Sequence, residues 1–176
     1  MPTDTDPQNL NEQGKQAFQS GQLEAAADSF RAASQAFAAA RDDLNAAESK
    51  NNLSVALLQM DRAQEALEAA LGTDGIFAKA GDLKRQGMAL GNQAAALEAL
   101  KRFDEALTAY DRSASVLAEA GEGDLRAMVL KSAAGIKLKR GKVSESVFKM
   151  FGSLEAKQNP SFFERILRAL VRFVQR

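Results

Sequence analysis

The chain has 176 residues, a length that suits either one compact domain or a short repeat array, and it contains neither Cys nor His. Those two absences exclude thiol nucleophiles, disulfides, imidazole bases and the usual zinc ligands. The 23 Lys and Arg residues balance the 23 Asp and Glu residues, but residues 1–80 carry 6 basic and 12 acidic side chains, whereas residues 125–176 carry 12 basic and 3 acidic ones. This uneven charge distribution influences which partners the protein can bind, but it does not indicate the fold.

Helix-forming residues dominate the composition. Alanine, the best helix former, is abundant, and the three prolines are confined to Pro2, Pro7 and Pro160. The acidic start, MPTDTDPQ, lacks the basic and apolar parts of a signal peptide, and no stretch approaches the ~18 apolar residues of a membrane span. We therefore expect a cytoplasmic protein built from successive helices.

A period of 40 residues runs along the chain. A small residue recurs at this spacing, as Ala26, Ala66, Ala106 and Ser146. Four residues after each small residue come Phe30, Ala70, Tyr110 and Met150, and eleven residues after the first three come Phe37, Phe77 and Leu117. A fixed period across several positions predicts a repeat architecture in which each unit is one supersecondary element.

Each unit is predicted to hold two antiparallel helices. The first helices are expected at 8–19, 44–59, 83–99 and 125–139. The second helices are expected at 23–40, 62–79, 103–119 and 143–157, each with its small residue one turn in, where it permits close approach of the pair. Gly72 and Gly75 predict a kink or break in the second helix of the second unit.

These elements predict an all-α helical-repeat solenoid. We expect a flexible N-terminal segment at 1–8 and four repeats over 9–157, with approximate limits at 9–42, 43–81, 82–123 and 124–157. A C-terminal amphipathic helix is expected at 158–176.

The repeat residues resemble the tetratricopeptide repeat (TPR) family. The resemblance is carried by GKQAFQSGQLEAAADSFRAA in the first unit, and by DRAQEALEAAL and KRFDEALTAYDRS later. In the first unit the family pattern is filled by Gly14, Gly21, Leu23, Ala26, Phe30 and Ala33. The period of 40 rather than 34 is similar to the longer TPR variants, such as those of kinesin light chains. The resemblance implies a right-handed superhelix with a concave groove, lined by the first helices, that binds a peptide or protein.

Catalytic chemistry is not indicated. The acidic residues fall at turns or beside Lys and Arg on helix faces, which are capping and solvation positions. Neither GxxxxGK[ST] nor GxGxxG is present. We therefore expect a non-enzymatic interaction scaffold, or adaptor, without a metal or cofactor.

The family resemblance assigns particular side chains of the first helices to the groove. They are Asn11, Lys15, Phe18, Asn51, Asn52, Val55, Leu58, Met88, Asn92, Ala95, Ala99, Met128, Lys131, Gly135 and Leu138. Asn52 and Asn92 lie 40 residues apart, and a side-chain amide can both donate to and accept from the main chain of an extended peptide. The alternative is that these asparagines tie helix to helix or meet only water. A chaperone-type carboxylate clamp is not expected, because Met88 stands where the resemblance requires a cation.

The C-terminal segment NPSFFERILRALVRFVQR combines a broad apolar stripe with a basic side. We expect it to cap the last repeat, which repeat arrays need for solubility. The open alternative is a surface for an anionic membrane or a partner, for which the candidate residues are Phe162, Phe163, Arg165, Arg168 and Arg172. We do not expect nucleic-acid binding, because the basic residues are not part of a recognisable nucleic-acid-binding motif. A second alternative for the whole chain is a homo-oligomer that pairs its acidic and basic ends head to tail.

Overall fold

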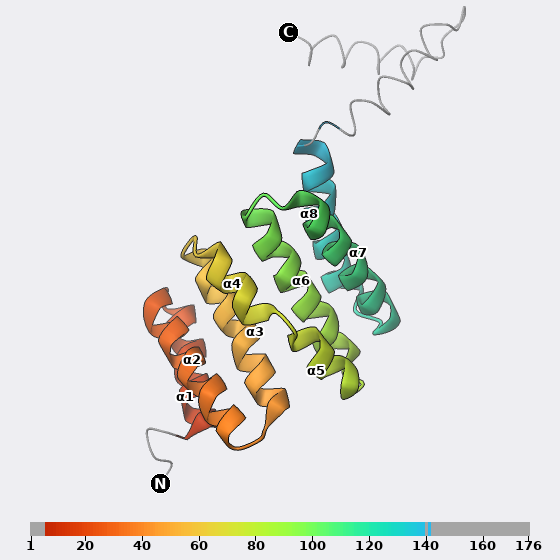
Figure 1. Cartoon of the computed structure of the whole chain (residues 1–176). Coiled ribbons are helices and arrows are strands. Elements are labelled where there is room, and N and C mark those ends of the chain that lie inside the picture. The colour runs from red at the N-terminus through yellow and green to blue at the C-terminus, as the bar shows by residue number, and fades with distance from the viewer. Residues whose placement is uncertain (1–5, 140, 142–176) are drawn as a thin grey trace, which may run out of the picture. The chain divides into compact units, whose positions relative to one another are not determined.

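The computed structural model describes residues 6–139 and 141, and this part of the chain is folded entirely into α-helices (Figure 1). The helices are α1 (Pro7–Gln19), α2 (Leu23–Ala39), α3 (Asp43–Gln59), α4 (Ala63–Ala70), α5 (Thr73–Lys79), α6 (Leu83–Ala99), α7 (Phe103–Glu119) and α8 (Gly123–Lys139). The predicted all-α helical-repeat solenoid is therefore confirmed, and most helix limits fall within two residues of those expected from the period.

The second unit departs from two continuous helices at the predicted place. Its second helix is divided into α4 and α5, and Leu71 and Gly72 separate them. Gly72 adopts the left-handed conformation, with φ of 79°, which glycine enters without a steric penalty. At the N-terminus, α1 begins at Pro7, slightly before the expected start, because proline suits the first turn of a helix.

Each turn between the two helices of a repeat contains one residue in the left-handed region. Gly21 fills that place in the first repeat with φ of 74°, whereas Asp61 and Lys101 fill it in the second and third with φ of 58° and 60°. The N–H group of the following residue then donates to a carbonyl of the preceding helix, as in the 2.9 Å bond from Arg62 to Leu57. These bonds satisfy carbonyl groups that the end of the helix would otherwise leave free.

Small residues bring the two helices of each repeat together. Ala26, Ala66 and Ala106 are fully buried, as the 40-residue period predicts. On the facing helix, Gly14 packs so closely against Phe30 that a Cβ atom at position 14 would lie 2.7 Å from the ring. The pairs are therefore fitted to residues that have no larger side chain.

Apolar side chains also join one repeat to the next. Phe37 of α2 packs with Ala46 of α3, and Phe77 of α5 packs with Ala47 of α3 and Ala89 of α6. Within this array α3 contacts α2 of the preceding repeat, α4 and α5 of its own repeat, and α6 of the next. Figure 1 shows this succession of helices within residues 6–133.

The chain divides into two compact units, residues 1–133 and 134–176. The expected second helix at 143–157 and the expected C-terminal helix at 158–176 lie outside the described residues. Within the part of the chain that the structure describes, no helix has the length and the apolar composition that crossing a membrane demands.

Candidate functional site

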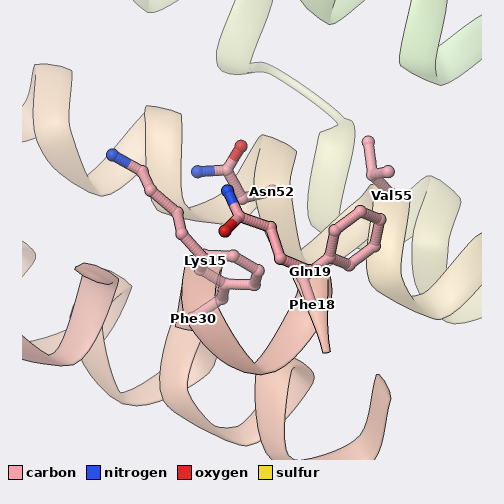
Figure 2. A pocket seen from close by; sticks show the side chains of 6 residues that line it. All are labelled: Lys15, Phe18, Gln19, Phe30, Asn52 and Val55. Carbon is pink, nitrogen blue, oxygen red and sulfur yellow. The ribbon is translucent and has the colours of Figure 1, made fainter. Parts of the chain in front are cut away.

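Two hollows lie on either side of α3. The first has a volume of about 160 Å³ and is lined by Lys15, Phe18, Gln19, Phe30, Asn52 and Val55, which come from α1, α2 and α3 (Figure 2). The second has a volume of about 210 Å³ and is lined by Glu48, Asn51, Asn52, Val55, Phe77, Arg85, Met88 and Asn92. Because Asn52 and Val55 line both hollows, the two are neighbouring parts of one groove along α1, α3 and α6.

Asn52 and Asn92 lie in equivalent places of consecutive repeats, and their side chains are partly exposed. Asn52 borders both hollows, and Asn92 borders the second. Neither side-chain amide forms a hydrogen bond with any other group among residues 6–139. The groove thus presents two amides whose donors and acceptors are available to a ligand.

Asn11 and Asn51 are more deeply buried than Asn52 and Asn92, although Asn51 also lines the second hollow. Asn11 is only 9% exposed, and its side-chain oxygen accepts a 3.2 Å hydrogen bond from the Ser49 hydroxyl, which joins α1 to α3. Asn51 is 8% exposed, and its side-chain oxygen lies 3.0 Å from the Thr73 hydroxyl of α5. These two asparagines join neighbouring helices, a role that the sequence analysis considers only for Asn52 and Asn92.

A polar network centred on the buried side chains of Thr73 and Gln93 lies at the break between α4 and α5. The break leaves the carbonyl oxygen of Ala70 outside the helical ladder, where it accepts from the Thr73 hydroxyl at 2.7 Å and from Gln93 Nε2 at 3.1 Å. Gln93 Nε2 also donates to Asp74 at 2.9 Å, and Asp74 pairs with Arg112 of α7 at 3.4 Å. The network therefore fixes α6 against the broken helix, directly beside Asn92.

The other predicted groove residues occupy different parts of the surface. Lys15 and Val55 line the first hollow, and Lys15 pairs with Glu12 at 2.8 Å. Met88 lines the second hollow and is 43% exposed, an unusual position for a large apolar side chain. Lys131 is exposed on α8 and does not border either hollow.

The sequence does not single out Arg85, which forms one wall of the second hollow. Its Nε donates to Asp82 at 2.6 Å, its Nη1 donates to Glu48 at 3.0 Å, and its guanidinium lies 5.2 Å from the centroid of the Phe77 ring. The hydrogen bond to Asp82 raises the pKa of Arg85, and the backbone N–H of Arg85 lowers the pKa of Asp82. The spacing Asp82-x-x-Arg85 is a capping signal, but the partner Glu48 is 37 residues away and has no local signature.

The C-terminal candidates Phe162, Phe163, Arg165, Arg168 and Arg172 lie outside the described residues. Within residues 6–139, no three His, Cys, Asp or Glu side chains are grouped so that they could hold a metal ion.

Comparison with known proteins identifies a structural likeness. The crystal structure of aspartyl phosphate phosphatase F from Bacillus subtilis is similar to this chain with a TM-score of 0.71 and 11% sequence identity. The match covers 82% of this chain and 38% of that protein, so this chain spans less than half of the length of that protein. No family model and no curated protein matches the sequence. The likeness shows the helical-repeat fold.

Proposed function

We propose that this protein is a non-enzymatic, cytoplasmic interaction scaffold that binds a peptide or protein partner in the groove formed by the first helices. The observation that carries this proposal is the pair of amides of Asn52 and Asn92. They face an apolar groove, and they lack a hydrogen-bonding partner among the described residues. An amide on an apolar surface is suited to the main chain of a peptide, which offers both donors and acceptors.

The catalytic alternative receives no support from the groove itself. Among the described residues, Arg85 borders the groove and is engaged in ion pairs with Asp82 and Glu48. The name of the structurally similar protein denotes a phosphatase, but at 11% identity the likeness concerns the fold. We therefore propose binding rather than catalysis, with neither a cofactor nor nucleic acid as partner.

The direct test uses a peptide library displayed against the full 176-residue chain. Peptides selected by the wild type would be measured by fluorescence anisotropy against a variant with both Asn52→Ala and Asn92→Ala. Loss of two hydrogen bonds, each of about 0.5–1.5 kcal/mol, is expected to weaken binding on the order of tenfold or more. The matched control is Gln35→Ala, which removes an exposed amide from α2 and should leave the affinity unchanged.

Equal affinity of the double variant and the wild type would contradict the assignment of the site, and the absence of any selected peptide would contradict the function. Circular dichroism of the double variant must show an unchanged melting transition, because a loss of fold would instead indicate a structural role for the two asparagines.

A second candidate function rests on the charge distribution. The acidic excess of residues 1–80 and the basic excess of residues 125–176 could join copies of the chain head to tail. Such self-association should weaken as salt rises, because the Debye length falls from ~10 Å at 0.1 M to ~3 Å at 1 M. Sedimentation velocity across this range tests it, and a monomer at all salt concentrations would exclude it.

A further inference from the structure

The charged side chains at the second hollow do not balance. Arg85 forms ion pairs with Asp82 at 2.6 Å and with Glu48 at 3.0 Å, so one cation faces two carboxylates. Both Arg85 and Glu48 line this hollow. In the first hollow, by contrast, Lys15 is matched by the single carboxylate of Glu12 at 2.8 Å. The cluster at the second hollow therefore keeps one uncompensated negative charge.

Glu48 presents part of this charge to an incoming ligand. Its Oε2 accepts the hydrogen bond from Arg85, whereas its Oε1 has no hydrogen-bonding partner among residues 6–139. The Glu48 side chain is 33% exposed, so it can reach a ligand while it is partly withdrawn from water. Lys84, the cation next to Arg85 in the sequence, pairs with Glu122 at 2.9 Å. A partly buried carboxylate attracts a cation more strongly than a fully exposed one, because the effective dielectric constant is lower.

The apolar lining of the second hollow suits the aliphatic part of a basic side chain. Val55 and Met88 border the hollow, and Met88 is 43% exposed. Lys and Arg bury their methylene groups along apolar surface while the charged group stays with water or a counter-ion. A cavity of about 150 Å³ holds a benzene molecule, and this hollow measures about 210 Å³. It therefore has room for a chain of three or four methylene groups.

A buried amide in the same hollow also has an unused hydrogen-bonding end. Asn51 lines the hollow and is 8% exposed. Its side-chain oxygen lies 3.0 Å from the Thr73 hydroxyl, whereas its side-chain nitrogen has no partner among the described residues. A ligand in the hollow can supply that partner, since a peptide carries a main-chain carbonyl beside each side chain. This amide points to a peptide occupant independently of the charged cluster.

The charge of the surrounding unit favours the same kind of partner. Residues 1–133, which form the first compact unit, contain 13 basic and 20 acidic side chains. A surface with an excess of one sign of charge attracts segments of the opposite sign and speeds their association. A basic peptide is therefore drawn to the unit that holds the groove.

We propose that the second hollow binds a lysine or arginine side chain of the peptide partner, with the cation at Glu48 and the methylene groups against Met88. The inference rests on the proposed peptide-binding function and names the chemistry of the partner. The main chain beside the basic residue lies within reach of the amides that line this hollow, those of Asn51, Asn52 and Asn92. An acidic residue at the same position of the peptide would meet the uncompensated negative charge and be rejected.

The test uses two synthetic peptide libraries and the full chain. Both libraries have random uncharged residues around one fixed central position, which is Lys in the probe library and norleucine in the other. Norleucine keeps the four-carbon side chain but lacks the ammonium group. Each peptide captured from the probe library is resynthesised with norleucine, and we expect about tenfold weaker binding in fluorescence anisotropy, because a hydrogen bond to a charged group is lost. Norleucine peptides that bind as tightly as their Lys counterparts would overturn the inference.

A variant of the protein assigns the cation to the second hollow. Glu48→Gln should weaken binding of the Lys peptides on the order of tenfold but change binding of the norleucine peptides by less than about twofold. Glu105→Gln is the matched control, because it removes a carboxylate from another Arg–Glu ion pair, on α7, and Glu105 does not line either hollow. Equal weakening of both kinds of peptide by Glu48→Gln would contradict the assignment, since a disturbed structure affects both.

The failure of this inference differs from the failure of the proposed function. If peptides from an unrestricted library bind in a manner that depends on Asn52 and Asn92, but their affinity does not change when their basic residues become norleucine, the groove binds peptides and the specificity for a basic residue is wrong. If no peptide from any library binds, both proposals are wrong.

Discussion

Replacement of Gly14 by Ala tests the close packing of the first helix pair. An ideal Cβ atom at position 14 would lie 2.7 Å from two ring atoms of Phe30 and 3.1 Å from a third, whereas real Cβ contacts below 3.0 Å essentially never occur. Phe30 is only 3% exposed, so its ring has little room to turn away. The overpacking is expected to lower the free energy of unfolding by about 1–3 kcal/mol. The better helix propensity of Ala offsets up to about 1 kcal/mol of this cost.

Gly75→Ala is the control that isolates the packing contribution. Gly75 is also helical, but a Cβ atom there would have no heavy atom within 4 Å beyond its own helical neighbourhood. Because both substitutions gain a comparable propensity, the difference between the two variants approximates the overpacking cost of Gly14→Ala, about 1–3 kcal/mol. Urea unfolding followed by circular dichroism measures this difference from the midpoints, provided that the slopes agree. If Gly14→Ala were as stabilising as Gly75→Ala, the close contact between α1 and α2 would be refuted.

Two further predictions concern buried polar groups. Ser54 and Ser113 are both fully buried, but the Ser54 hydroxyl has no hydrogen-bonding partner among the described residues, whereas the Ser113 hydroxyl donates to the Gly87 carbonyl at 2.7 Å. Thermal melting should therefore show that Ser54→Ala stabilises and Ser113→Ala destabilises the fold, each by about 1 kcal/mol. Stability changes of the same sign in both variants would contradict this prediction. Burial raises the pKa of Tyr110 to about 12, so the folded state holds its phenol proton where the unfolded chain has lost it. Stability should be complete below pH 10 and fall on the order of 2 kcal/mol as the pH rises to about 12. The stability of the Tyr110→Phe variant should not fall over this pH range. A fall of the same size in that variant would show that another group causes it.

The alkaline titration can be followed without interference from other residues. Tyr110 is the single tyrosine of a sequence that contains no tryptophan. Its ultraviolet absorbance therefore reports the ionisation of this phenol alone, and a midpoint near pH 10 in the folded protein would contradict its burial and its 3.0 Å hydrogen bond to Glu98.

The repeat period was sufficient to predict the helices but not all of the groove. Burial of Ala66 and Ala106 follows directly from periodicity, since a repeated small residue marks the place where two helices meet. The break at Gly72 follows from a local propensity. These features depend on residues that are close in sequence or separated by a constant interval.

The roles of neighbouring asparagines could not be separated in the same way. Asn51 and Asn52 are adjacent in the sequence, but successive helix positions differ by ~100° around the axis. Asn51 therefore meets Thr73 and is only 8% exposed where it lines the second hollow, whereas Asn52 is partly exposed and borders both hollows. The burial of Asn51 depends on Thr73, which is 22 residues away in the sequence. The break between α4 and α5 sets the position of Thr73. The ion pair of Arg85 with Glu48 was missed for the same reason, since its partners lie on different repeats.

An NMR titration of the full chain with a library-selected peptide detects the binding of a peptide to the groove at the level of single side chains. The side-chain amide signals of Asn52 and Asn92 are observable in their own right, so the titration reports on the proposed contacts rather than on affinity alone. We expect these two signals to shift most, together with backbone signals of α1, α3 and α6 around the two hollows. Unchanged signals of both asparagines, with shifts confined to exposed positions of α2 and α7, would contradict this expectation.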